Sequence, residues 1–154
     1  GTEADLESTL LSLLEHRENH FEIVVVHADN YADPYALDGD EITLIDSEGS
    51  FVDLIHDGVQ ASLSPVVQIL LPGTTVQSDW NAAALDAFDD YRIGAIAASV
   101  AVANLKSNII GLQGDQLTRH RLVTDRDHPT EIYPMLNGGY FRRKLLISLD
   151  GLFA

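Results

Sequence analysis

Two apolar runs in the sequence are each followed by polar residues that could bind a ligand. Residues 21–26 and 66–71 are the two runs, and the polar residues that follow them are His27, Asp29 and Asn30 after the first and Pro72, Gly73 and Thr74 after the second. Runs rich in Val and Ile are typical of strands buried on both faces. Open α/β sheets bind ligands at the carboxyl ends of their strands. The two clusters therefore predict a ligand site at one edge of a sheet.

Each cluster also has a purely structural interpretation. His27 and Asp29 could read a nucleotide base or ribose, whereas Asp29-Asn30 could simply start a turn, because both side chains bond their own backbone. Gly73 could let a phosphate approach the backbone closely, but a Pro-Gly turn needs glycine anyway. Both interpretations stay open for each cluster.

Basic residues in the last third of the chain could hold a phosphate if the fold brings them together. They are Arg119, His120, Arg121, Arg142, Arg143 and Lys144. The planar guanidinium suits phosphate because it donates two hydrogen bonds at once; a scatter of surface charges is the equal alternative. The 6 histidines are dispersed without the helical spacing of a zinc site, so we predict no bound metal.

The pattern of apolar residues predicts the elements that would position these side chains. Helices are expected at residues 2–16, 50–63, 80–91 and 144–149, and strands at residues 21–26, 41–46, 66–71 and 93–102. Strands that alternate with helices predict an α/β fold with a largely parallel sheet. We expect strands 21–26 and 66–71 to be interior and parallel to each other, with residues 71–75 at their carboxyl end.

Composition limits the classes of function. The 154 residues fit one domain, residues 1–154, and the content of 45% hydrophobic and 21% charged residues is that of a globular protein. The net charge of −15 argues against nucleic acid and anionic membrane as partners. No apolar run reaches the ~20 residues of a membrane span, so we expect a cytoplasmic protein. A small-molecule ligand and a homo-oligomer stay open.

The run Leu70-Leu71-Pro72-Gly73-Thr74-Thr75-Val76-Gln77-Ser78-Asp79-Trp80 resembles the centre of the family-2 glycosyltransferases, whose pattern is L-D-x-D-T-x-V-x-P-D-W. Residues 138–146 and 150–153 are similar to a later segment of that family. The resemblance implies a GT-A fold, a Rossmann-like three-layer sandwich with a mixed, mainly parallel sheet. It also implies transfer of sugar from a nucleotide sugar with Mg²⁺ or Mn²⁺. The positions that match the family's nucleotide-sugar site are His27, Asp29, Asn30, His56, Gly58, Pro72, Gly73, Thr74 and Arg142.

The chain departs from the family pattern where the chemistry would occur. Leu71 and Gly73 stand in place of the two aspartates that hold the metal and diphosphate. The family's first strand, which lies between the strands matched by residues 21–26 and 66–71, has no counterpart, so the resemblance implies that these two strands pair directly. The chain also ends before the family's catalytic base. We therefore expect a glycosyltransferase-like domain without a metal cofactor that is inactive as an isolated chain. The alternative is a non-catalytic binding or assembly module with the same scaffold.

Overall fold

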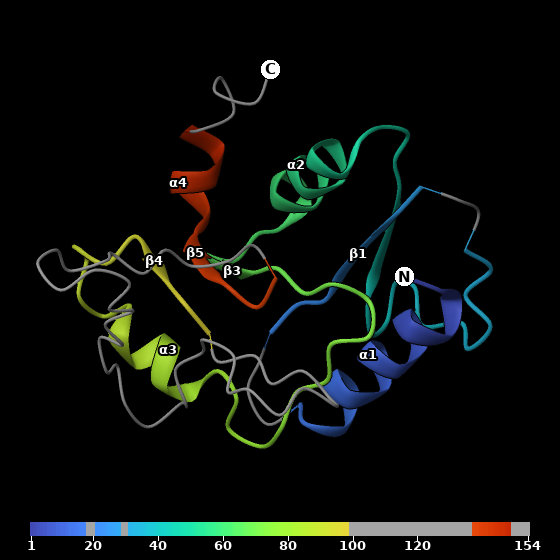
Figure 1. Cartoon of the computed structure of the whole chain (residues 1–154), viewed down its shortest axis with the longest axis horizontal. Coiled ribbons are helices and arrows are strands. Elements are labelled where there is room, and N and C mark those ends of the chain that lie inside the picture. The colour runs from blue at the N-terminus through green and yellow to red at the C-terminus, as the bar shows by residue number, and fades with distance from the viewer. Residues whose placement is uncertain (18–20, 29–30, 99–136, 149–154) are drawn as a thin grey trace, which may run out of the picture.

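The computed structural model describes residues 1–17, 21–28, 31–98 and 137–148. The elements in chain order are α1 (Glu3–Glu15), β1 (Val24–His27), β2 (Thr43–Asp46), α2 (Phe51–Ala61), β3 (Val66–Gln68), α3 (Ala82–Ala87), β4 (Ala95–Ile96), β5 (Tyr140–Arg142) and α4 (Arg143–Ser148). Figure 1 shows their arrangement, a mixed α/β fold. Each predicted helix and strand has a counterpart of the same type, although most are shorter than predicted; residues 99–102 and 149 of the predicted elements lie outside the described residues.

The first two strands form a parallel sheet that is covered on both faces. β1 pairs with β2 in the register Val25↔Leu44. Because side chains alternate along a strand, Val25 faces the core that includes Leu10 and Leu13 of α1, whereas Val26 faces α2. There a Cβ on Gly58 would lie 3.0 Å from the Val26 Cγ2 atom, so α2 is seated directly on β1.

Both long helices begin where a short-range capping signal predicts. Thr2 caps α1 and Ser50 caps α2, and each forms a capping box with the aspartate three residues later, Asp5 and Asp53. In such a box the hydroxyl and the carboxylate satisfy backbone N–H groups that a helix leaves unpaired. The helix starts are therefore local properties of the sequence.

The other three strands form an antiparallel sheet with β5 in its centre. Its order is β3-β5-β4, and Val67 of β3 lies opposite Phe141 of β5. The prediction that residues 66–71 form an interior strand paired directly with residues 21–26 is wrong for the described residues. β3 instead lies at the edge of the other sheet, and its residues are only half-buried. Its described partner is β5, which comes from a distant part of the sequence. A single, mainly parallel sheet is therefore not what the described strands form.

Trp80 joins the two halves of the molecule. It packs against the core around α1 and β1 and also against the core formed by Ala84, Phe88, Ile96 and Tyr140. Its ring lies edge-on to Phe21, with centroids 5.8 Å apart, and stacks on Tyr140 at 6.2 Å. The hydroxyl of Tyr140 donates to the Trp80 carbonyl oxygen at 3.0 Å. One side chain thus connects both sheets.

A carboxylate ties the start of β1 to the start of β3. The Glu22 Oε1 atom accepts hydrogen bonds from Ser62 Oγ at 2.8 Å, from Leu63 N at 2.8 Å and from Ser64 N at 2.7 Å. Burial raises the pKa of Glu22, but the hydrogen bonds from Ser64, Ser62 and Leu63 lower it by more, so the pKa falls below its ordinary value of 4.5. The ionised carboxylate therefore stabilises the folded chain.

We expect Glu22→Gln to lower the free energy of unfolding by about 1 kcal/mol at pH 7, because the exposed amide oxygen keeps the contacts but loses the charge. Since the folded pKa is depressed, this stabilisation is present above pH 4.5 and is lost as the pH falls below that value. Urea denaturation of both proteins at pH 7 and pH 3 measures the difference. An equal difference at the two pH values would contradict the role of the charge.

Candidate functional site

Polar residues gather at the carboxyl ends of β1 and β2, and only some of them were predicted from the sequence as ligand-binding residues. The His27 Nδ1 atom lies 3.9 Å from Asp46 Oδ1, and the His27 side chain is only 15% exposed. The ring of Tyr31 packs beside His27, with centroids 6.1 Å apart. His27 is therefore placed at the edge where the sequence predicts a ligand. Asp29 and Asn30 lie outside the described residues.

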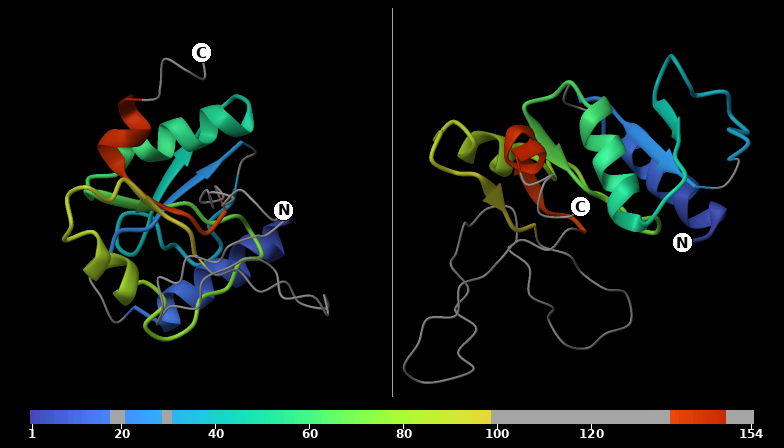
Figure 2. Two further views of the ribbon diagram at one scale, coloured as in Figure 1. Left: turned by 60° about the vertical axis from the view of Figure 1, so that its left-hand side comes forward. Right: turned by 90° about the horizontal axis from the view of Figure 1, so that it is seen from above.

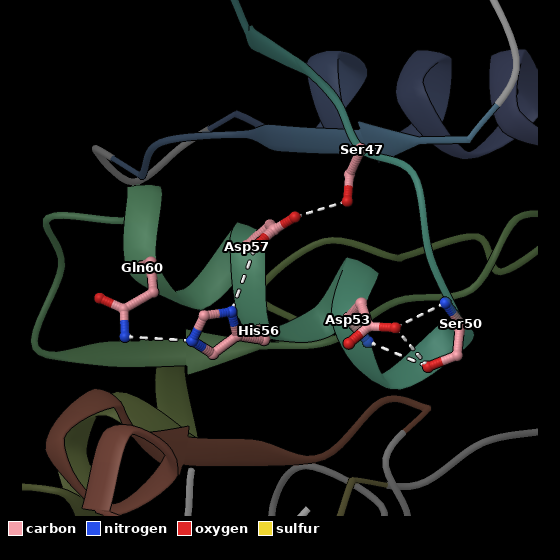
Figure 3. Close-up of polar contacts among 6 residues, drawn as sticks. All are labelled: Ser47, Ser50, Asp53, His56, Asp57 and Gln60. Atoms are coloured by element: carbon pink, nitrogen blue, oxygen red, sulfur yellow. Dashed lines mark hydrogen bonds and ion pairs between the residues drawn. The ribbon is translucent and has the colours of Figure 1, made fainter. Parts of the chain in front are cut away.

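A network of hydrogen bonds connects Ser47, after β2, with residues of α2 (Figure 3). The Ser47 hydroxyl donates to Asp57 Oδ2 at 2.5 Å, and the other carboxylate oxygen of Asp57 lies 3.1 Å from His56 Nδ1. The Gln60 Nε2 atom lies 3.4 Å from His56 Nε2. A neutral His56 that donates from Nδ1 and accepts at Nε2 satisfies both contacts. Of these residues, the sequence predicts only His56.

This hydrogen-bond network combines a serine, an aspartate and a histidine, but not in the order that activates a nucleophile. In a serine–histidine–aspartate triad the histidine is the immediate base of the serine, and the aspartate bonds the far side of the histidine. Here the Ser47 hydroxyl donates directly to Asp57, and hydrogen bonds from Ser47 and then His56 lower the pKa of that carboxyl. A carboxylate with a low pKa is a weak base. The arrangement can bind hydroxyl groups and cations, and it is unsuited to nucleophilic catalysis.

The loop after β3 makes contacts with α1 at the position of the family's aspartates. The backbone N–H of Gly73 donates to Asp5 O at 3.0 Å and to Thr9 Oγ1 at 2.9 Å. Gly73 has φ +90°, a left-handed conformation that glycine adopts without steric cost. The turn and the contact with α1 thus account for a glycine at position 73, and this residue has no side chain that could bind a ligand.

Asn137 holds the other side of this loop. Its Oδ1 atom accepts from Leu71 N at 2.9 Å and from Thr74 Oγ1 at 3.3 Å. Pro72 packs against the amino terminus of the chain, since a Cβ on Gly1 would lie 2.5 Å from Pro72 Cβ. Nothing in the spacing of the sequence identifies Asn137 as a partner of this loop. Thr9 could have been noticed as a polar residue on the buried face of a predicted helix.

Arg142 lies against the backbone at the end of α3. Its Nη2 atom donates to Phe88 O at 2.7 Å and to Asp90 O at 2.9 Å, and its Nε atom donates to Ile93 O at 2.7 Å. The guanidinium carbon also lies 5.2 Å from the centroid of the Phe88 ring. Carbonyl groups at the end of a helix lack intrahelical partners, and Arg142 satisfies that of the C-cap residue Phe88 together with two carbonyls of the segment that follows. A phosphate gripped by both of these nitrogen atoms would displace those carbonyls.

Arg143 has the same role for α2. Its Nε atom donates to Val59 O at 2.9 Å, and its Nη2 atom donates to Gln60 O at 3.0 Å. Lys144 is exposed. The remaining members of the predicted phosphate cluster, Arg119, His120 and Arg121, lie outside the described residues.

The predicted site residues are therefore divided among separate sets of contacts. His27, His56 and Gly58 lie around β1 and α2, residues 72–74 contact α1 and Asn137, and Arg142 caps α3. A pocket of about 160 Å³ lies at the opposite, amino end of β1 and β2, beside the ion pair of Arg17 and Glu41. Ligand pockets typically measure about 300–1,000 Å³, so this one is too small for a nucleotide sugar.

The donor atoms near the loop after β3 do not fit the metal that the family resemblance implies. Leu71 and Gly73 offer no side-chain oxygen. In the described part of the chain, no group of three or more His, Asp or Glu side chains is arranged to hold a metal ion. Within the same residues, no helix combines the length and apolar character that crossing a membrane requires.

No protein-family model matches the chain, and no curated protein sequence matches it.

Proposed function

We propose that the chain is a glycosyltransferase-like domain of the family-2 type that does not transfer sugar by itself. The support for the family is the resemblance of residues 70–80 and 138–146 to its sequence pattern. The observation that carries the functional part is the loop after β3. Where the family holds a metal with two aspartates, this chain has a leucine and a glycine whose N–H groups bond Asn137 and α1.

Electrostatics supports the absence of transfer. The diphosphate of a nucleotide sugar is stabilised in this family by the metal, and loss of such an ion removes several kcal/mol of transition-state stabilisation. The net charge of the chain is −15, and the carboxyl edge of β1 and β2 presents Asp46 and Asp57. Without a cation these carboxylates repel a diphosphate. The site therefore disfavours the donor substrate in both charge and ligand set.

We expect UDP to bind with a Kd weaker than about 1 mM, whether or not Mn²⁺ is present, because the diphosphate lacks both a metal and convergent arginines. Isothermal titration calorimetry of the full chain, with UDP alone, Mn²⁺ alone and both together, measures this. Micromolar binding that requires Mn²⁺ would contradict the proposal. Micromolar binding of UDP alone would instead indicate phosphate binding through arginine.

The hydrogen-bond network at α2 favours a second candidate function, that of a non-catalytic binding module. Ser47, His56 and Asp57 present hydroxyl, imidazole and carboxylate groups but no activated nucleophile. Such groups bind the hydroxyls of a ribose or sugar without a phosphate. Uridine in place of UDP separates the two candidates. Shifts of the His27 and His56 ring signals in NMR that are larger with uridine than with UDP support the binding module.

A further inference from the structure

Asn137 is directly followed by Gly138, and no other asparagine of the sequence precedes a glycine. In such a pair the backbone nitrogen of the glycine can attack Cγ of the asparagine side chain, because glycine has no Cβ that hinders the approach and its backbone adopts many conformations. The pair thus contains both a nucleophile and the carbonyl carbon with which it reacts. Whether the reaction occurs depends on how the fold holds these two groups.

This reaction removes the side-chain amide and needs only water. The Gly138 nitrogen forms a bond to Asn137 Cγ while the bond between Cγ and Nδ2 breaks, and the proton of the Gly138 N–H leaves with the amide group as ammonia. Water then opens the resulting succinimide ring at one of the two bonds to the Gly138 nitrogen. Opening at Cγ gives aspartate, and opening at the backbone carbonyl carbon gives isoaspartate. One water is consumed and one ammonia is released, so the atoms balance.

The fold holds both reacting groups in hydrogen bonds. Gly138 N donates to Ile69 O at 2.6 Å. The Asn137 Oδ1 atom accepts from Leu71 N at 2.9 Å and from Thr74 Oγ1 at 3.3 Å. While the first bond is formed, the nitrogen keeps its proton and that proton points to Ile69, so the nitrogen is not available to attack Cγ. The other two bonds fix the orientation of the side chain.

The bond from Gly138 belongs to the pairing of β3 with β5. Figure 2 shows β5, in red, alongside β3, in green. Gln68 lies opposite Tyr140, Ile69 N donates to Gly139 O at 3.2 Å, and Gln68 Nε2 donates to Gly138 O at 3.0 Å. Among the described residues, the Gly138 N–H forms the outermost backbone bond of this ladder. The ends of a ladder open more readily than its centre, so separation of β5 from β3 releases the nitrogen first.

We propose that Asn137 is a site of spontaneous deamidation and that separation of β5 from β3 sets its rate. The reaction places a carboxylate beside the loop after β3. In the aspartate product a carboxylate oxygen still accepts from Leu71 N and Thr74 Oγ1. In isoaspartate the carboxylate is attached directly to Cα, one methylene closer to the backbone, so it does not reach both donors without a shift of the chain. The isoaspartate form therefore holds this loop less firmly.

Peptide mass spectrometry of the full chain, incubated in its folded state, measures deamidation at residue 137. The blocked peptide MLNGGY, which has the sequence of residues 135–140, gives the rate without a fold at the same pH and temperature. We expect the folded chain to deamidate at least about tenfold more slowly than the peptide, and the chain unfolded in urea to approach the rate of the peptide. Equal rates in the folded chain and the peptide would overturn the proposal, as would an unfolded chain that does not deamidate.

Two variants separate opening of β5 from unfolding of the whole chain. Phe141→Leu truncates a buried side chain of β5, and Leu10→Val truncates a buried side chain of α1 in the core around β1. We expect Phe141→Leu to raise the rate in the folded chain about fivefold and Leu10→Val to change it by less than about twofold. Urea denaturation verifies that each variant folds; if Phe141→Leu does not, Val67→Ala, opposite it on β3, replaces it. Equal acceleration by the variants of the two cores, or none by the variant of the β3–β5 pair, overturns the control by β5.

Discussion

Replacing Trp80 with alanine is expected to lower the free energy of unfolding by about 3 kcal/mol, the largest effect of any single substitution considered for this chain. The indole contacts Phe21 before β1 and Tyr140 on β5, so its removal leaves a cavity between the two cores. Burial raises the pKa of Tyr140, which keeps its phenol neutral as the donor to the Trp80 carbonyl. Urea denaturation followed by circular dichroism measures the loss, because the variant no longer contains tryptophan.

Trp80→Phe is the matched control. It keeps an aromatic ring against Phe21 and Tyr140, and we expect it to restore about half of the lost stability because aromatic pairs contribute beyond their buried area. Leu11→Ala serves as a surface reference, since Leu11 is 60% exposed, and it should change stability by less than about 1 kcal/mol. A loss below that level for Trp80→Ala would show that the two halves are held together elsewhere.

Replacing Arg142 with alanine is expected to lower the free energy of unfolding by about 2–3 kcal/mol. The substitution removes the side-chain donor of the Phe88 and Ile93 carbonyls in a partly buried position, whereas the Asp90 carbonyl still accepts from Ile93 N. Arg142→Lys restores the charge but not the planar fork, so we expect it to recover only a small part of the loss. Urea denaturation of each variant measures these differences.

Arg92→Ala is the control for Arg142. The side chain of Arg92 is 76% exposed and pairs with Asp90 at the surface, where an ion pair contributes about 0–1 kcal/mol. If Arg142→Ala leaves stability unchanged and instead alters binding of inorganic phosphate, the residue serves a ligand rather than α3. A loss of stability without an effect of phosphate supports the capping role.

Local signals in the sequence predicted the helices well. Thr2 with Asp5 and Ser50 with Asp53 identify the starts of α1 and α2, because a capping box involves only neighbouring residues. α3 was predicted to be longer, at residues 80–91. It is limited to Ala82–Ala87 because Asp79 before it has φ 57°, and because the carbonyls after it bond Arg142 instead of continuing the helix.

The pairing of strands could not be predicted in the same way. The apolar character of residues 66–71 indicates burial, but it does not reveal that β5 pairs with β3 in antiparallel orientation. The role of β5 depends on residues far away in the sequence. Arg142 of β5 and the adjacent Arg143 of α4 resemble a phosphate site until their acceptors are known. The same applies to Asn137, whose amide contacts the loop after β3. Long-range acceptors have no signature in residue spacing.

The position of β5 in the chain has a consequence for synthesis. α1, β1, β2 and α2 have emerged once residue 61 has been made, and β1 and β2 can then pair. β3 follows directly but receives its partner only when residues 140–142 have been made, and Arg143 then bonds the last turn of α2. Contacts between distant residues form late and slow folding. During translation β3 therefore waits for its β5 partner until residues 140–142 have emerged, an interval in which association with other chains competes with folding.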